Sequence, residues 1–183
     1  MSRTVLAGLS LAVVVAACGG PMTADEYVDE LNALVSRTRS EFVRAVTAYQ
    51  QIEEPTLAEG AAFLDQEVAL RREMLEGFDE LEPPESLTSL LGLLRGAMAR
   101  LLAAAEALIP VAETIDSVDQ LVGTPELAEY EAANDDGARV CLEVQGELDD
   151  LTASGQAFAG EPWIPDLGLA VRAALGCGEI EAG

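Results

Sequence analysis

Residues 87–115 read LTSLLGLLRGAMARLLAAAEALIPVAETI and form the most regular stretch of the chain. Their spacing places one apolar face along a single α-helix, which predicts a central position in a helical fold. Pro110 removes one backbone hydrogen bond within this pattern, so we expect a kink there rather than the end of the helix. The apolar residues recur without a break at Leu87, Leu91, Leu94, Met98, Leu101, Ala105, Leu108, Ala112 and Ile115.

Two further helices are predicted before this stretch, and each begins with a capping signal. The sequences Thr23-Ala24-Asp25-Glu26 and Thr56-Leu57-Ala58-Glu59 place Thr at the cap and Glu three residues later, as in a capping box. The first helix is predicted to run to about Ile52 and the second to about Leu81. Pro84 then suits the first position of the third helix, where its missing donor costs nothing. The apolar stripes of the two helices contain Tyr27, Leu31, Leu34, Thr38, Phe42, Ala45, Tyr49, Ile52, Leu57, Leu64, Val68, Leu75 and Phe78.

A fourth helix is predicted from Thr124-Pro125-Glu126, which supplies a cap, a first-turn proline and a first-turn acid. It continues toward Leu151 and is expected to run through the unfavourable residues 134–137. Its apolar positions are Leu127, Tyr130, Ala133, Val140, Val144 and Leu148.

The last part of the sequence predicts a loop and then a short helix. Residues 154–165 are rich in loop-forming types, and Phe158 and Trp163 are predicted to close the open end of the core. The helix is predicted from about Asp166 to Leu175, with Gly176 at its end.

These elements together predict an all-α fold, an antiparallel up-down four-helix bundle with a short C-terminal helix. The turns between the four long helices are short and marked by proline. Short turns make consecutive helices pack as neighbours, which favours the up-down arrangement. We expect a single domain over residues 23–183.

The N-terminus has the pattern of a cleaved secretory signal. Arg3 precedes a thirteen-residue, largely apolar run from Val5 to Ala17, which is too short to span a bilayer. Val15-Ala16-Ala17-Cys18 resembles the bacterial lipobox. That resemblance implies a signal peptide over residues 1–17, a lipid on Cys18 and a tether over residues 18–22. The alternative is an ordinary signal peptide whose cleavage site happens to carry a cysteine.

Acylation at Cys18 implies a stable membrane anchor, because two or three acyl chains hold a protein on a bilayer where one does not. The expected location is therefore the extracytoplasmic face of the cell membrane. The membrane itself and another envelope protein are the expected partners.

Two cysteines remain if Cys18 is acylated, and in an oxidising compartment they predict a disulfide between Cys141 and Cys177. The alternative is a pair of buried free thiols. A metal site on the two thiolates is a poorer interpretation, because the chain contains no His and, with Cys18 acylated, no further free Cys to complete a tetrahedral set.

The charge of the chain excludes one class of partner. It has 33 Asp and Glu against 10 basic residues, a formal net charge of −23 at pH 7. Such a surface repels phosphate backbones, so we expect no nucleic-acid binding.

Arg71 is the one charged residue that falls on an apolar seam, between Val68 and Leu75. We interpret it as an arginine that lies along the edge of the core and turns its head outward toward Glu67, four residues earlier. A buried arginine that holds an anionic ligand is the alternative.

The composition also argues against catalysis. The chain has no His and no Lys, and with its cysteines engaged it offers no thiolate nucleophile. We therefore predict a protein that is not an enzyme and has no cofactor. Weak binding of hard cations is an alternative. It would use the acidic clusters Glu53-Glu54, Asp79-Glu80 with Glu82, Asp135-Asp136 and Asp149-Asp150.

Three short motifs occur along the mature sequence: a Tyr-x-x-x-Leu-Asn pattern at residues 27–32, a Leu-x-Pro-Pro-x-x-Leu turn at residues 81–87, and Cys141 with a terminal Gly-Cys-Gly at residues 176–178. In these motifs the sequence resembles the uncharacterised helical lipoproteins of actinobacterial envelopes. It departs from relatives that carry a cysteine in the first helix. The resemblance implies a fold and a location but no activity.

The function predicted from the sequence is thus a non-enzymatic binding or structural module, held on the membrane by its lipid. A protein that buffers or captures divalent cations is the runner-up. A third hypothesis is a small apolar ligand near the Pro110 kink, in a cavity lined by Met98, Leu101 and Leu108.

Overall fold

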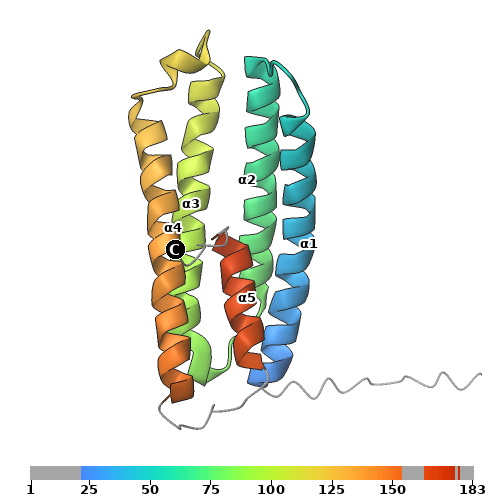
Figure 1. Cartoon of the computed structure of the whole chain (residues 1–183), viewed down its shortest axis with the longest axis vertical. Coiled ribbons are helices and arrows are strands. Elements are labelled where there is room, and N and C mark those ends of the chain that lie inside the picture. The colour runs from blue at the N-terminus through green and yellow to red at the C-terminus, as the bar shows by residue number, and fades with distance from the viewer. Residues whose placement is uncertain (1–21, 154–162, 176, 178–183) are drawn as a thin grey trace, which may run out of the picture.

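The computed structural model describes residues 22–153, 163–175 and 177, and these form an all-α fold (Figure 1). The predicted antiparallel bundle of four long helices with a short C-terminal helix is confirmed. The long helices are α1 (Ala24–Gln50), α2 (Leu57–Glu80), α3 (Thr88–Ala112) and α4 (Pro125–Ala153), and the short one is α5 (Trp163–Leu175). Single 3-10 turns, η1 (Glu85–Leu87) and η2 (Val118–Gln120), lie in the connections on either side of α3.

Helices α1 and α2 begin at the predicted capping boxes. The hydroxyl of Thr23 accepts a hydrogen bond from the N–H of Glu26 (3.3 Å), and the Glu26 carboxylate accepts one from the N–H of Thr23 (3.0 Å). Thr56 and Glu59 repeat this arrangement: the Thr56 hydroxyl accepts from the N–H of Glu59 at 3.3 Å, and the Glu59 carboxylate accepts from the N–H of Thr56 at 2.8 Å. In both boxes the backbone hydrogen bond from the threonine lowers the pKa of the glutamate below its ordinary value.

The bounds of α3 differ from the prediction at both ends. Pro84 has an extended backbone (ψ 148°) and precedes η1, so the α-helix begins at Thr88 rather than at Pro84. The helix ends at Ala112 rather than continuing to Ile115, which puts Pro110 in its last turn. Proline supplies no N–H to the helical ladder, and the chain leaves the helix two residues later.

Helix α4 runs without a break through residues 134–137, as predicted. Asp136 supports this segment, because its carboxylate pairs with Arg139 one turn later and with Arg100 of α3. Helix α5 begins at Trp163, three residues before the predicted start, since Pro165 is tolerated in a first turn. Phe158 lies outside the described residues, as does the side chain of Trp163, so their predicted role as plugs stays a prediction.

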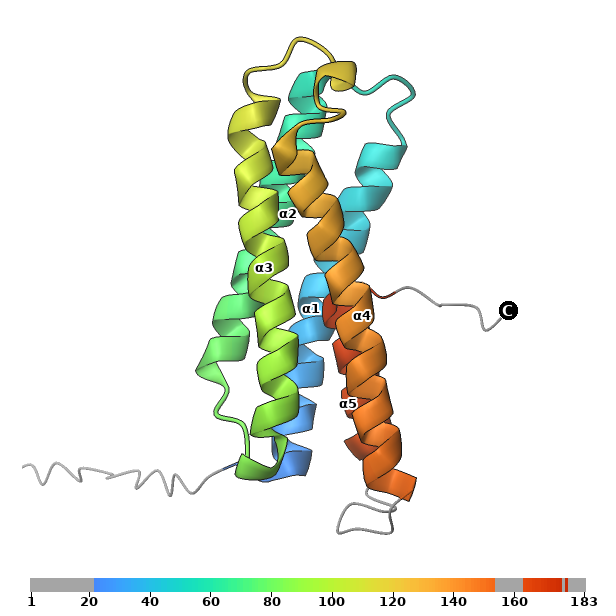
Figure 2. The ribbon, with the colours of Figure 1, turned by 90° about the vertical axis from the view of Figure 1, so that its left-hand side faces the viewer.

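Helix α5 lies between α1 and α4 and completes one half of the bundle (Figures 1 and 2). It packs mainly against α1, then against α4 and α3, whereas the other main helix contacts join α1 to α2, α2 to α3 and α3 to α4. Its 13 residues extend about 20 Å, while the 29 residues of α4 extend about 44 Å. The half of the bundle near the start of α1 is therefore covered by α5, and the opposite half is not.

Buried residues follow one another along α3, as its periodicity predicts, and they belong to one large apolar cluster and two smaller ones. The buried positions of α3 are Leu90, Leu91, Leu94, Ala97, Met98, Leu101, Leu102, Ala104, Ala105 and Leu108. The segment Glu85–Ala112 is long and apolar enough to cross a membrane, yet half of its apolar window is buried inside the protein. Its apolar character is thus accounted for by its place at the centre of the bundle.

Ion pairs between neighbouring helices run along the surface. Arg95 of α3 forms a two-pronged pair with Asp79 of α2, at 2.5 and 2.8 Å, and its hydrogen bonds lower the pKa of Asp79. Arg72 of α2 reaches Glu106 of α3 at 2.6 Å. Each exposed pair contributes little by itself, on the order of 1 kcal/mol or less.

Candidate functional site

An open apolar pocket lies at the end of the bundle where α1 and α3 end and where α2 and α4 begin. Its volume is about 350 Å³. All four long helices and the connection between α3 and α4 contribute residues to its lining. The lining residues are Tyr49, Pro55, Thr56, Leu57, Gly60, Ala61, Phe63, Leu64, Glu67, Leu108, Ala112, Ile115, Leu121, Leu127 and Tyr130.

The pocket lies where the apolar stripes of the helices reach the end of the bundle, beyond the half that α5 covers. Along α3, Leu91 and Leu94 are fully buried, whereas Ile115 beyond the helix end is only half-buried. Tyr49 near the end of α1 and Leu127 near the start of α4 are also half-buried. Apolar side chains that face one another without being covered form an opening rather than a filled core.

One wall of the pocket is an aromatic pair. The rings of Tyr49 on α1 and Phe63 on α2 stack with their centroids 4.8 Å apart and their planes at 16°. Such a pair holds two large side chains in a fixed arrangement. The wall between α1 and α2 is therefore largely apolar.

The base of the pocket is polar, because Glu67 lies there with only 5% of its surface exposed. Its Oε1 accepts a hydrogen bond of 2.8 Å from Nε of Arg71 and also lies 2.6 Å from the terminal nitrogen of that arginine. The hydroxyl of Tyr130, on α4, donates to the same oxygen at 2.9 Å. A buried carboxylate is thus satisfied by an arginine on its own helix and a tyrosine from across the core.

Arg71 pairs with Glu67, as the sequence predicts, but the predicted outward direction of the pair is wrong. The side chains of Arg71 and Glu67 are only 17% and 7% exposed. The guanidinium lies 5.7 Å from the centre of the Phe42 ring, a cation–π contact. A second, small cavity of about 50 Å³ lies on this side of Arg71, lined in part by Phe42 and Met74. The pair points inward because Tyr130 on the facing helix offers Glu67 a buried partner.

The sequence indicates Tyr130 only as part of an apolar stripe. Burial raises the pKa of Tyr130 above its ordinary value, and the charge of Glu67 raises it further. The phenol is therefore a neutral donor at physiological pH. The signal that points to it in the sequence is indirect: a charged residue on an apolar seam needs a polar partner on another helix.

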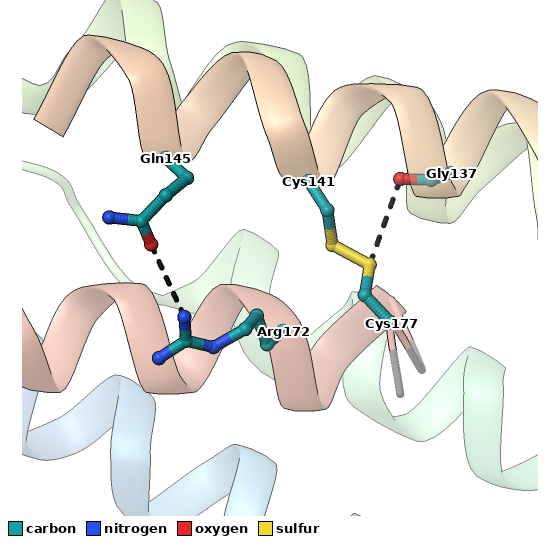
Figure 3. The surroundings of a disulfide bond; sticks show 5 residues. All are labelled: Gly137, Cys141, Gln145, Arg172 and Cys177. Atoms are coloured by element: carbon teal, nitrogen blue, oxygen red, sulfur yellow. Dashed lines mark hydrogen bonds between the residues drawn. A yellow bond between two sulfur atoms is a disulfide. The ribbon is translucent and has the colours of Figure 1, made fainter. Parts of the chain in front are cut away.

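The predicted disulfide between Cys141 and Cys177 is present, with the two Cα atoms 6.6 Å apart (Figure 3). Cys141 lies on the buried face of α4, and Cys177 follows α5, where its sulfur lies 3.8 Å from the carbonyl oxygen of Gly137. Arg172 of α5 donates a 3.4 Å hydrogen bond to Gln145 of α4 nearby. The disulfide therefore fixes the end of α5 against α4. Cys18 lies outside the described residues.

The acidic clusters do not come together into a cation site within the described segments. No group of three or more His, Cys, Asp or Glu side chains suited to a metal ion occurs there. Asp79 and Asp136 are instead engaged by arginines, and the hydrogen bond from Arg139 lowers the pKa of Asp136.

The hypothesis of an apolar cavity at the Pro110 kink is only partly right in its placement. Of the three residues predicted to line it, Leu108 does line the pocket. Met98 and Leu101 are buried in the filled core instead. The opening lies nearer the end of the bundle than the sequence indicates, where α3 and α4 meet their connection.

Comparisons with known proteins give no relative for this chain. No family model, no curated protein and no solved structure matches it.

Proposed function

We propose that this protein is a lipid-anchored binding module of the cell envelope, which holds a small apolar molecule in the pocket at the free end of its bundle. The observation that carries the proposal is the pocket itself. Its volume of about 350 Å³ lies within the range of small-molecule sites, roughly 300–1,000 Å³. An apolar lining with a few polar groups at its base is also typical of such sites.

The N-terminal sequence supports the membrane part of the proposal. Val15-Ala16-Ala17-Cys18 resembles a lipobox, and acylation of Cys18 would hold the protein on the extracytoplasmic face of the membrane. The described chain starts at Met22, at the end of the bundle where α1 begins. Since the 27 residues of α1 extend about 40 Å, the pocket would open away from the lipid surface.

A binding role agrees with the chemistry of the pocket better than a catalytic role does. The chain has no His, and Glu67 at the base of the pocket is engaged by Arg71 and Tyr130. These groups can orient a ligand but offer no activated nucleophile. We therefore propose that the protein stores, presents or passes on its ligand, and that the receiving partner is another component of the envelope.

Binding of the neutral fluorescent probe N-phenyl-1-naphthylamine tests the pocket. A neutral probe avoids repulsion by the acidic surface. We expect saturable binding at one site, with increased fluorescence. Ile115→Trp would fill the mouth of the pocket and weaken binding at least tenfold, whereas Val43→Trp, at an exposed position on α1 outside the lining, would leave it unchanged. A lack of saturable binding, or an equal loss in both variants, would contradict the proposal.

A further inference from the structure

We infer that the pocket selects an apolar molecule that carries a hydroxyl group, and that Glu67 recognises this hydroxyl as a hydrogen-bond acceptor. This inference rests on the proposed binding function and names the chemical class of its ligand. Three features carry it: the position of Glu67, the unequal use of its two oxygens, and the charge balance with Arg71.

The first feature is that Glu67 belongs to the lining of an otherwise largely apolar pocket. Burial of a carboxylate in such surroundings is costly unless it is paired and hydrogen-bonded. An apolar residue at this position would fill the same space without that cost. A carboxylate at the base of the pocket therefore points to a polar group on the molecule that occupies it.

The second feature is that the contacts of Glu67 converge on one oxygen. Both arginine nitrogens and the Tyr130 hydroxyl reach Oε1, at 2.8, 2.6 and 2.9 Å. Within the described residues no hydrogen bond ends on Oε2. An ionised carboxylate has about four acceptor sites over its two oxygens, so Oε2 retains the capacity to accept from a ligand.

The third feature is charge, and it distinguishes a hydroxyl from other donors. Arg71 already balances the charge of Glu67, so a ligand ammonium would bring an uncompensated positive charge into an apolar pocket. A carboxylic acid would be repelled by Oε2. A purely apolar ligand would cover Oε2 without bonding to it and would leave a desolvated acceptor. A hydroxyl adds one hydrogen bond to a charged group and no net charge.

Three small molecules with the same hydrocarbon body test the inference by calorimetry on the purified protein. 4-Butylphenol carries a hydroxyl donor, 4-butylanisole carries an oxygen that can only accept, and butylbenzene carries neither. We expect 4-butylphenol to bind about tenfold more tightly than the other two, which corresponds to one hydrogen bond to a charged group.

Two variants assign the preference to Glu67. In Glu67→Gln the amide oxygen can still accept from Arg71 and Tyr130, so its NH2 group would face the ligand. The preference for 4-butylphenol over 4-butylanisole should then fall to threefold or less. Glu76→Gln makes the same change at an exposed acid of α2 outside the lining, and it should keep the tenfold preference.

The outcomes separate this inference from the proposed function. Equal affinity for the three compounds in the unmodified protein would overturn the inference while the pocket still binds apolar molecules. A preference that survives in Glu67→Gln would overturn the role of Glu67. If no compound binds, both the inference and the proposed function fail. Should Glu67→Gln not fold, the comparison of 4-butylphenol with 4-butylanisole in the unmodified protein still decides.

Discussion

The hydroxyl of Tyr130 on α4 donates a 2.9 Å hydrogen bond to Glu67 on α2, across 63 residues of sequence. Helices α2 and α4 each pack along α3 rather than along one another. The bond therefore spans the bundle diagonally and joins its two halves at the base of the pocket. It couples the stability of the fold to the polar group that we propose for ligand recognition.

Removal of this bond should destabilise the protein. Tyr130→Phe leaves the Glu67 carboxylate with Arg71 alone, and the loss of a hydrogen bond to a charged group should lower the free energy of unfolding by about 1.5 kcal/mol. Urea unfolding followed by circular dichroism measures it. Tyr49→Phe is the matched control, since the Tyr49 hydroxyl makes no hydrogen bond among the described residues. Equal losses in the two variants would show that the diagonal bond contributes nothing.

Removal of the Tyr27 hydroxyl should have the opposite effect on stability. Its side chain is fully buried at the start of α1, and its hydroxyl has no hydrogen-bond partner within the described part of the chain. A buried hydroxyl without a partner is unfavourable, so Tyr27→Phe should stabilise the protein by about 1 kcal/mol. Thermal unfolding at pH 7 provides the measurement, and a lower melting temperature in the variant would count against this prediction.

The raised pKa of Tyr27 predicts a second effect of Tyr27→Phe, on stability at high pH. Burial raises this pKa to about 12, above the ordinary value near 10. A raised pKa contributes stability that is present below about pH 10 and is lost as the pH rises through about 12. This part of the alkaline loss should be absent in Tyr27→Phe.

The disulfide should contribute a large share of the stability. Cys141 and Cys177 are 36 positions apart, and closing a loop of this length contributes roughly 3–4 kcal/mol on the chain-entropy model. Reduction, or the double variant Cys141→Ser with Cys177→Ser, should lower the urea midpoint accordingly. In the double variant a reductant should have no further effect. If reduction leaves the midpoint of the unmodified protein unchanged, α5 is held by packing alone.

Acid should weaken the two capping boxes. The pKa values of Glu26 and Glu59 are lowered in the folded protein, so their contribution is present above the ordinary carboxyl pKa of about 4 and is lost as the pH falls through the lower folded values. Glu26→Gln with Glu59→Gln keeps both side-chain caps without a titrating group. Urea unfolding between pH 5 and pH 2 should show a smaller loss in this variant. Glu54→Gln, which changes an exposed acid outside the capping boxes, should lose as much stability over this pH range as the unmodified protein.

Features that depend on nearby residues could be predicted from the sequence. The starts of α1 and α2 are encoded within four residues at Thr23 and Thr56, and the pairing of Arg71 with Glu67 follows from their spacing of one helical turn. The structure confirms each of them. The disulfide could also be predicted, because only two cysteines remain after Cys18.

Features that depend on contacts between distant helices could not be predicted from the sequence. Glu67 is buried because Tyr130 reaches it from α4, and no local pattern around either residue encodes that contact. The position of the pocket depends on where the four long helices begin and end relative to one another, which no local pattern encodes. The early start of α5 at Trp163 likewise overrides the loop-like residues that precede Asp166.

The intact mass of the protein purified from the membrane fraction tests the central claim most directly. We expect the mass of residues 18–183 with diacylglycerol on Cys18, less two hydrogens for the disulfide, and a shift of the protein out of the membrane fraction in Cys18→Ser. The mass of the full chain from Met1 with an unmodified Cys18 would contradict it.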